Sequence, residues 1–244
     1  METIVITGAG GHVGTAIRPL LRDRRRLVLL DRAAISDAGA QETAIVADIG
    51  DEKALIQAFR GAAGVIHLAG CTTEEPIEQQ IAGNVQGAWN VFAAAKEAGV
   101  PRVVFTSSHH VVGHYPRYRR LFADQAGLRV LAIRVGFVGE KPIDRRRLSI
   151  WISPRDLTQL IEIGLAHPDL RYALVYGVSN NARGFFDNGA AFALGYRPQD
   201  SADEHAAAIL SGPPENPDAL GSRVIGGAMA QQGFSGDPAR IDEW

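Results

Sequence analysis

The chain has 244 residues, of which 46% are hydrophobic, enough to bury the core of one large α/β domain without disulfides. Its formal net charge is -2, so the overall charge favours neither nucleic acid nor an anionic membrane as a partner. A single cysteine, Cys71, cannot form an internal disulfide, which predicts a reducing, cytoplasmic compartment. No apolar run reaches membrane-spanning length, and no residue pattern predicts a metal site.

Short apolar runs alternate with helical patterns, which is typical of βαβ units and a parallel sheet. The chain opens on a strand pattern instead of a signal peptide, so we expect no leader. In chain order the pattern predicts strands at 3–7, 27–31, 43–48, 65–69, 102–107 and 129–135, with helices at 12–22, 52–59 and 76–99. Right-handed crossovers then give an α/β fold with a doubly wound parallel sheet, the Rossmann fold.

Beyond Gly136 the pattern loosens. A helix is predicted at 154–166, a strand at 171–176 and a short helix at 187–195, and the tail after Ser211 is rich in Gly and Pro. No linker marks a second independent domain. We therefore expect a nucleotide-binding core of residues 1–135 and a small C-terminal substrate-binding portion, residues 136–244, packed on it.

A glycine-rich turn follows the first predicted strand. The segment Thr7-Gly8-Ala9-Gly10-Gly11-His12-Val13-Gly14 has the T-G-x-x-G-x-x-G pattern and opens an amphipathic helix. Glycines suit this place because the turn is tight, the backbone approaches a pyrophosphate and the helix packs close to the strand. A lone glycine pattern is weak, but its position between a strand and a helix predicts a dinucleotide site.

Asp31 ends the second predicted strand, about twenty residues further on, as the dinucleotide fingerprint requires. Its carboxylate is expected to accept hydrogen bonds from the adenosine ribose and to repel a 2′-phosphate, so the cofactor predicted is NAD. Arg32 argues mildly for NADP, because a basic residue there can pair with that phosphate.

Further residues are expected around the cofactor. Asp48 and Ile49 follow the third strand and are placed to meet the adenine, although Asp48 could equally cap the helix that begins at Glu52. His67 is expected to be a packed strand residue. The full cofactor-binding set predicted is Gly8, Gly11, His12, Val13, Gly14, Asp31, Asp48, Ile49, Leu68, Ala69, Gly70 and Asn84.

With these residues in place, the chain resembles the extended short-chain dehydrogenases of the NAD-dependent epimerase/dehydratase superfamily. A finer likeness to uronate dehydrogenases comes from five blocks, which occur in the family's order and span nearly the whole chain. They are 105–117, which contains Ser-Ser-His-His, and 146–151, 175–180, 186–188 and 194–196.

This resemblance implies NAD-dependent oxidation of glucuronate or galacturonate at the anomeric carbon, which gives an aldarolactone. Ser108 would hydrogen-bond the reacting oxygen, while Thr72, His109 and His110 would line the sugar site. Arg146 would grip the substrate carboxylate with its two-pronged guanidinium. Taken without the family, Arg146 reads as a solvent-facing member of the run Arg145 to Arg147.

The chain departs from the family at its catalytic helix. Such enzymes carry Tyr-x-x-x-Lys, but the lysines here are Lys53, Lys96 and Lys141, and none lies four residues after a tyrosine. Between Arg117 and Leu128 a contiguous block equivalent to a loop and two or three helical turns is absent. Either the chain truly lacks this block, or the sequence omits a segment present in the molecule.

A true deletion has structural consequences. The family's helix normally covers the sheet beside the strands at 65–69 and 102–107 and commonly forms a dimer's helix bundle. We therefore expect exposed apolar sheet surface, and a homo-oligomer, otherwise possible, is doubtful if the helix is deleted. Tyr115 and Tyr118 are candidate substitute bases, but packing is the favoured interpretation because neither has a lysine partner.

Three functions remain at this point. The favoured one is a uronate-type NAD-dependent dehydrogenase acting on a small sugar acid. Its rival is an NAD-binding protein of the same fold that has lost hydride transfer. A nucleotide-sugar epimerase or dehydratase ranks last, because those enzymes generally need a larger C-terminal lobe.

Overall fold

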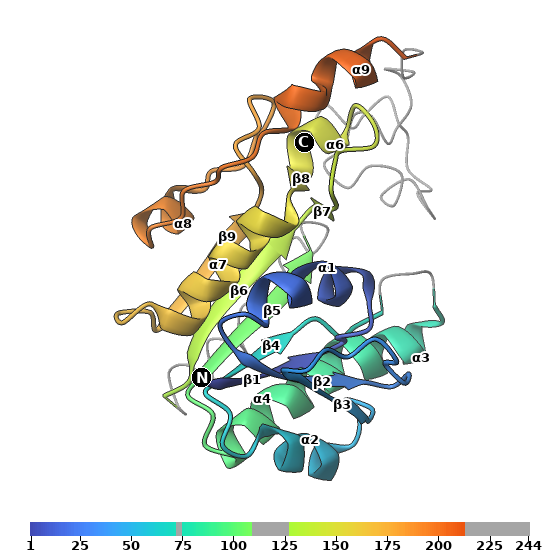
Figure 1. The fold of residues 1–244 in the computed structure, drawn as a ribbon, viewed down its shortest axis with the longest axis vertical. Helices are drawn as coiled ribbons and strands as arrows, with labels where there is room; N and C mark the ends of the chain where they lie inside the picture. Colours follow the sequence, from blue (N-terminus) through green and yellow to red (C-terminus); the bar gives the residue numbers. More distant parts are fainter. Residues whose placement is uncertain (72–74, 109–126, 213–244) are drawn as a thin grey trace.

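A seven-stranded parallel sheet organises the computed structural model, which describes residues 1–71, 75–108 and 127–212 (Figure 1). The strand order is β3-β2-β1-β4-β5-β6-β9, and every neighbouring pair is parallel. The strands are β1 (Thr3–Thr7), β2 (Arg26–Asp31), β3 (Glu42–Val46), β4 (Gly64–His67), β5 (Arg102–Ser108), β6 (Arg129–Val135) and β9 (Tyr172–Gly177). The doubly wound Rossmann fold is confirmed, and each predicted strand is present within a few residues of its expected bounds.

Helices cover both faces of the sheet, so its central strands are buried, whereas the edge strand β3 is largely exposed. On one face α1 (His12–Leu21) and α7 (Pro154–Ala166) pack against Ile4, Val104 and Leu131. On the other, α2 (Glu52–Phe59) and α4 (Gly87–Glu97) cover a second apolar cluster. Strands buried on both faces read as continuous apolar runs, which is why the sequence signalled them clearly.

The expected exposure beside β4 and β5 is not found. Every residue of β4 is buried, and so are Val103, Val104 and Phe105 of β5. The reason is that α4 supplies Val91 and Phe92 to the same apolar cluster as Val103 and Phe105. This part of the sheet is therefore covered by a helix that the chain retains.

The long helix expected at 76–99 is divided. It consists of α3 (Ile77–Gln80), a π-helical segment η1 (Ile81–Gln86) and α4. Two glycines allow close packing there: a Cβ at Gly83 would lie 2.9 Å from Cys71 Sγ, and one at Gly87 would lie 2.3 Å from Ile49 Cδ1. The wider π turn thus lies where neighbouring loops approach the helix, an arrangement common near functional sites.

The C-terminal portion continues beyond the ends of β5 and β6 (Figure 1). It contains the paired strands β7 (Phe137–Val138) and β8 (Trp151–Ile152), the helices α6 (Arg147–Ile150), α8 (Gly189–Ala193) and α9 (Ala206–Leu210), and a 3-10 turn η2 (Ala202–His205). Except for α8, these short elements were not predicted. The division at residue 135 stays a prediction, and α7 and β9 beyond it pack on or pair with the main sheet.

Buried Asp156, in α7, holds two later segments of the C-terminal portion against that helix. Its carboxylate accepts hydrogen bonds from Ser179 Oγ (2.6 Å), Gln199 N (2.7 Å) and Asp200 N (3.1 Å). Ser153 caps α7 through the N–H of Asp156 (3.0 Å). Three fixed donors satisfy a fully buried charge, and the segment around Gln199 is thereby held against the helix.

Within the described ranges, no helix is long and apolar enough to cross a membrane. The same residues contain no group of three or more His, Cys, Asp or Glu side chains suited to a metal ion.

Candidate cofactor and substrate site

The glycine-rich turn has the close backbone approach that a dinucleotide needs. Gly8 has φ +71°, and a Cβ there would lie 2.6 Å from Ala69 N. A Cβ at Gly14 would lie 2.4 Å from Ala9 O, so only glycine lets α1 pack against the turn. Side chains at these two positions would push the turn away from the backbone at Ala69 and push α1 away from the turn, which would disturb the shape that a pyrophosphate requires.

The N-terminus of α1 is directed at this cradle without a side-chain cap. Gly11 is the N-cap residue and supplies no side-chain hydrogen bond, so the first N–H groups of the helix remain for an anion. His12 connects the turn to the C-terminal portion, because its Nε2 lies 2.7 Å from Val138 O. Val13 is half-buried and packs against the core.

A cavity of 380 Å³, a size in the range of small-molecule pockets, lies at the predicted adenosine end of the site. Its lining residues are Gly10, Gly11, Thr15, Arg18, Asp31, Ala33, Ala34, Ile35, Ser36 and Asp37. Asp31 is fixed there by two backbone donors, Gly10 N to Oδ2 (3.0 Å) and Ala33 N to Oδ1 (3.1 Å). A carboxylate has about four acceptor positions, so capacity remains for ribose hydroxyls.

The proposed capping role of Asp48 is wrong. Asp51 is the N-cap of α2, because its side chain accepts the N–H of Ala54 at 3.0 Å. Asp48 instead accepts the N–H of Gly50 at 2.6 Å, which shapes the turn before the helix. Asp48 lies three positions before the cap, so its carboxylate is not drawn into the helix terminus. Its contact with adenine stays a prediction.

Asn84 shapes the turn that follows β4. Its Oδ1 accepts the N–H of Cys71 (2.8 Å) and its Nδ2 donates to Cys71 O (3.1 Å). A Cβ at Gly70 would lie 2.8 Å from Asn84 Oδ1, so the turn and the π-helical segment approach closely. Ile49 is held to the adjoining helix α4, because Asn90 Nδ2 donates to its carbonyl (3.0 Å). The contact of Ile49, Gly70 and Asn84 with the cofactor stays a prediction.

His67 is a packed strand residue, as predicted. It is 1% exposed, and its Nδ1 lies 2.7 Å from Thr7 Oγ1. Burial lowers the pKa of His67 to about 3, so the imidazole is neutral at physiological pH. A buried neutral ring on β4, in contact with Thr7 of β1, serves the fold in preference to proton transfer.

Of the predicted substrate residues, the structure describes Ser108 and Arg146. Ser108 is the last residue of β5, half-buried at the carboxyl end of the sheet, and is paired in register with Val135. Arg146 is half-buried in the position before α6. Thr72, His109, His110, Tyr115 and Tyr118 lie outside the described residues, so their roles stay predictions.

The other two arginines of the run are engaged in the C-terminal portion. Arg145 Nη2 donates to Leu210 O (2.7 Å) and Gly212 O (3.0 Å). Arg147 pairs with Asp144 and lies over the Phe137 ring, 5.5 Å from its centroid. Arg145 and Arg147 therefore anchor neighbouring segments, and the contact of Arg146 with the substrate carboxylate stays a prediction.

Sequence reasoning missed Arg18, which lies in the wall of the adenosine cavity. Its Nη2 is 2.9 Å from Glu42 Oε2, and its Nη1 is 3.2 Å from Asp37 Oδ1. The signal was available: Gly14, Ile17, Arg18 and Leu21 form the buried face of α1. An arginine on such a face needs an anionic partner.

The Rossmann sheet, the glycine cradle at a helix N-terminus and the acid that ends β2 together define a dinucleotide-binding protein of the nicotinamide class. The NAD dependent epimerase/dehydratase family matches residues 4–126. A uronate dehydrogenase of Pseudomonas syringae pv. tomato is 31% identical over 261 residues, covering 96% of this chain and 95% of the relative. This alignment is longer than the 244-residue chain, so it contains gaps where the relative has additional residues.

Two solved structures are similar along the whole chain. A tyrosine-to-alanine variant of uronate dehydrogenase from Agrobacterium tumefaciens, complexed with NAD, has a TM-score of 0.89 and 30% identity, covering 95% of this chain and 98% of that one. Glucuronic acid dehydrogenase from Chromohalobacter salexigens has the same TM-score and identity, with 98% of both chains covered. The chain belongs to the NAD dependent epimerase/dehydratase family, as an NAD-dependent dehydrogenase by class.

Proposed function

We propose that this chain oxidises a hexuronate, glucuronate or galacturonate, at the anomeric carbon with NAD as the hydride acceptor. The observation that carries the proposal is the combination of a complete adenosine and pyrophosphate cradle with a likeness to uronate dehydrogenases that extends through the C-terminal portion. A likeness confined to the cofactor half would support only nucleotide binding.

The chain's own residues divide the work by position. Backbone N–H groups at the start of α1 would hold the pyrophosphate, and Asp31 the adenosine ribose. Bound NAD supplies the acceptor of the hydride that leaves C1 of the sugar. Ser108 would hydrogen-bond the anomeric oxygen from the end of β5, and Arg146 would hold the carboxylate at the far end of the sugar. Thr72, His109 and His110 are proposed to contact the sugar.

The hydroxyl proton must leave as the hydride departs, and the family's tyrosine and lysine are not in this sequence. A second candidate function follows from that observation: a protein that binds NAD without turning over sugar acids. The gapped alignment with a longer relative supports the absence of a block from this chain. Epimerase or dehydratase activity stays the third interpretation.

NADH formation discriminates between the two leading functions. The purified chain is mixed with NAD and glucuronate or galacturonate, with glucose as the neutral control, and its intact mass is compared with 26.1 kDa. Uronate-dependent NADH formation that glucose does not elicit supports the dehydrogenase. NAD binding without turnover, at the expected mass, supports the second function, and failure to bind NAD contradicts both.

A further inference from the structure

A buried ion-pair network lies beneath one wall of the adenosine cavity. Arg18 donates to Glu42 with two groups, Nη2 to Oε2 at 2.9 Å and Nε to Oε1 at 3.3 Å. The Arg18 side chain is 5% exposed and that of Glu42 is 0% exposed. The hydrogen bond to Glu42 raises the pKa of Arg18, so the guanidinium remains charged inside the wall. This bidentate contact uses the fork geometry that arginine would otherwise offer to a phosphate.

Asp37 joins the same network from the pocket side. Arg18 Nη1 donates to Asp37 Oδ1, and Nη2 donates to Asp37 O, each at 3.2 Å. The Asp37 side chain is 67% exposed, in contrast to the covered arginine. The Asp37 carboxylate therefore faces solvent at the cavity, whereas the Arg18 guanidinium is covered.

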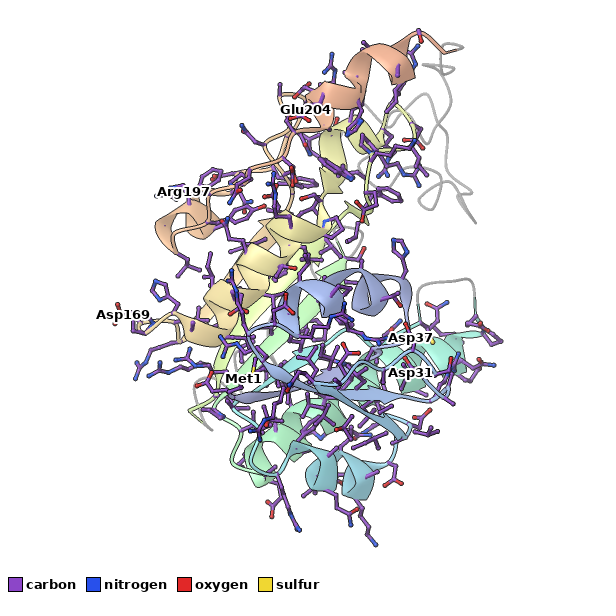
Figure 2. All side chains as sticks on the ribbon, viewed as in Figure 1. Met1, Asp31, Asp37, Asp169, Arg197 and Glu204 are labelled. Carbon is purple, nitrogen blue, oxygen red and sulfur yellow. The ribbon has the colours of Figure 1, made fainter. Side chains whose placement is uncertain are left out.

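The network also positions the wall itself. Residues 32–41 connect β2 to β3 without a helix or strand, and Ala33 to Asp37 all line the cavity. Arg18 holds this connection at Asp37, and Glu42 Oε2 accepts the N–H of Gly39 at 2.7 Å. Figure 2 shows Asp31 and Asp37 close to one another on the same side of the molecule.

We propose that Asp37, held by the Arg18–Glu42 pair, is a second residue that selects NAD over NADP. Its carboxylate repels the 2′-phosphate of NADP from a position separate from that of Asp31. Glu42 binds the buried guanidinium of Arg18, so this cation is not available to the phosphate. Two like charges near a phosphate act through water and are screened by salt, so the contribution is moderate and depends on ionic strength. The proposal rests on NAD as the cofactor and needs no catalytic turnover.

Two small ligands isolate the adenosine end. AMP and adenosine 2′,5′-bisphosphate differ by the 2′-phosphate, and calorimetry on the full chain gives the Kd of each. In Asp37→Asn, which keeps an oxygen for Arg18, we expect the bisphosphate to bind about fivefold more tightly at low salt, with AMP within about twofold of the parent. The gain should shrink as salt is raised.

The control is Asp169→Asn, which makes the same change in net charge at an exposed residue on the opposite side of the molecule (Figure 2). It should leave both Kd values unchanged. The proposal is overturned if Asp37→Asn leaves the ratio of the two Kd values at its parental value, or if Asp169→Asn changes that ratio equally.

Glu42→Gln tests the role of the buried partner. It leaves the charge of Arg18 without its bidentate acceptor, so a folded variant should bind the bisphosphate at least as tightly as Asp37→Asn does. A cooperative thermal transition establishes that it is folded, and a folded variant without this gain contradicts the role of Glu42. If the variant does not fold, Asp37→Asn decides. Loss of uronate turnover alone would contradict the proposed function and leave these Kd values untouched.

Discussion

Ionisable side chains near the predicted cofactor site differ in whether they offer a charge to a ligand. Asp31 presents a carboxylate fixed by two backbone donors at the edge of the adenosine cavity. His67 contacts Thr7, the residue before Gly8 of the glycine-rich turn, but its ring is buried and neutral. The difference is burial, which decides whether an ionisable side chain acts on ligands or on folding.

Asp31 should set the main cofactor preference. NAD is expected to bind at least about tenfold more tightly than NADP, a difference of about 1.4 kcal/mol. Asp31→Ala should remove most of that preference, because both the ribose acceptor and the nearest negative charge are lost. Calorimetric titration with each dinucleotide measures it. Equal affinities in the parent would refute the assignment, and an unchanged preference in the variant would assign selection to other residues.

Arg146 should distinguish the sugar acid from a neutral sugar. Arg146→Lys is expected to weaken glucuronate binding to the NAD complex by about tenfold, because lysine cannot make the two-pronged contact. NAD affinity should barely change. Arg24→Lys, at an exposed arginine, is the matched control. Glucuronate binding that survives Arg146→Ala unaltered would place the carboxylate elsewhere.

His67 should make the fold sensitive to acid. Its folded pKa of about 3 lies below the ordinary value of 6.5, so the unfolded chain takes up a proton that the folded chain refuses. The free energy of unfolding should therefore be unaffected by this group above about pH 6.5 and fall by about 1.4 kcal/mol per pH unit from there towards pH 3.

The measurement is denaturant unfolding at pH 7 and pH 5. Between these values the His67 contribution to the free energy of unfolding should fall by about 2 kcal/mol. His67→Gln, which keeps an amide group beside Thr7, should lose that part of the dependence. The same pH dependence in parent and variant would show that other groups are responsible.

At the scale of elements, hydrophobic periodicity predicted the strands and helices whose apolar residues are buried in the core. The seven sheet strands and helices α2 and α7 follow from apolar runs and periodicity in their own sequence. The two-residue strands β7 and β8 carry no periodicity, and the π-helical division of 76–99 follows from packing against Cys71 and Ile49. Contacts between residues that are distant in the sequence could not be predicted from periodicity either.

The site shows the same limit. Glycine spacing and Asp31 were readable because one local turn builds that part of the cradle. The Arg18–Glu42 pair joins residues 24 positions apart on two elements, and its meaning depends on a wall that has no regular structure. The buried face of α1 indicated that Arg18 needs a partner, but not which acid supplies it.

The contact between the glycine turn and α1 gives the prediction at this scale. Gly14→Ala would place a Cβ 2.4 Å from Ala9 O, so the turn must shift even though alanine favours a helix by about 1 kcal/mol. NAD affinity should fall by at least about tenfold, as measured by calorimetry. Gly189→Ala, whose Cβ would meet the Asp187 carboxylate at 3.2 Å, is the control. Unchanged NAD affinity in Gly14→Ala would contradict the close-packing requirement.

For the whole molecule, the decisive property is that a glycine cradle suited to NAD occurs in a sequence without the Tyr-x-x-x-Lys pattern of the family it resembles. General-base assistance is worth about 10²–10⁴-fold, so a chain of 26.1 kDa should bind NAD yet turn over uronates more slowly than a complete enzyme by a factor at or beyond the upper end of that range. Intact mass together with NADH formation checks this. Robust turnover at the expected mass would require another base, and Tyr115, His109 and His110 would be tested first.

The position of β9 has a consequence for how the chain is made. β6 is complete at Val135, but its second hydrogen-bonding edge is paired only when Tyr172–Gly177 has been synthesised. At about 5–20 residues per second, this interval lasts a few seconds on the ribosome. Throughout it, the nascent protein displays an open apolar strand, the kind of edge that neighbouring chains can join. During synthesis, the C-terminal portion therefore first covers the open edge of the sheet, before it has any substrate to bind.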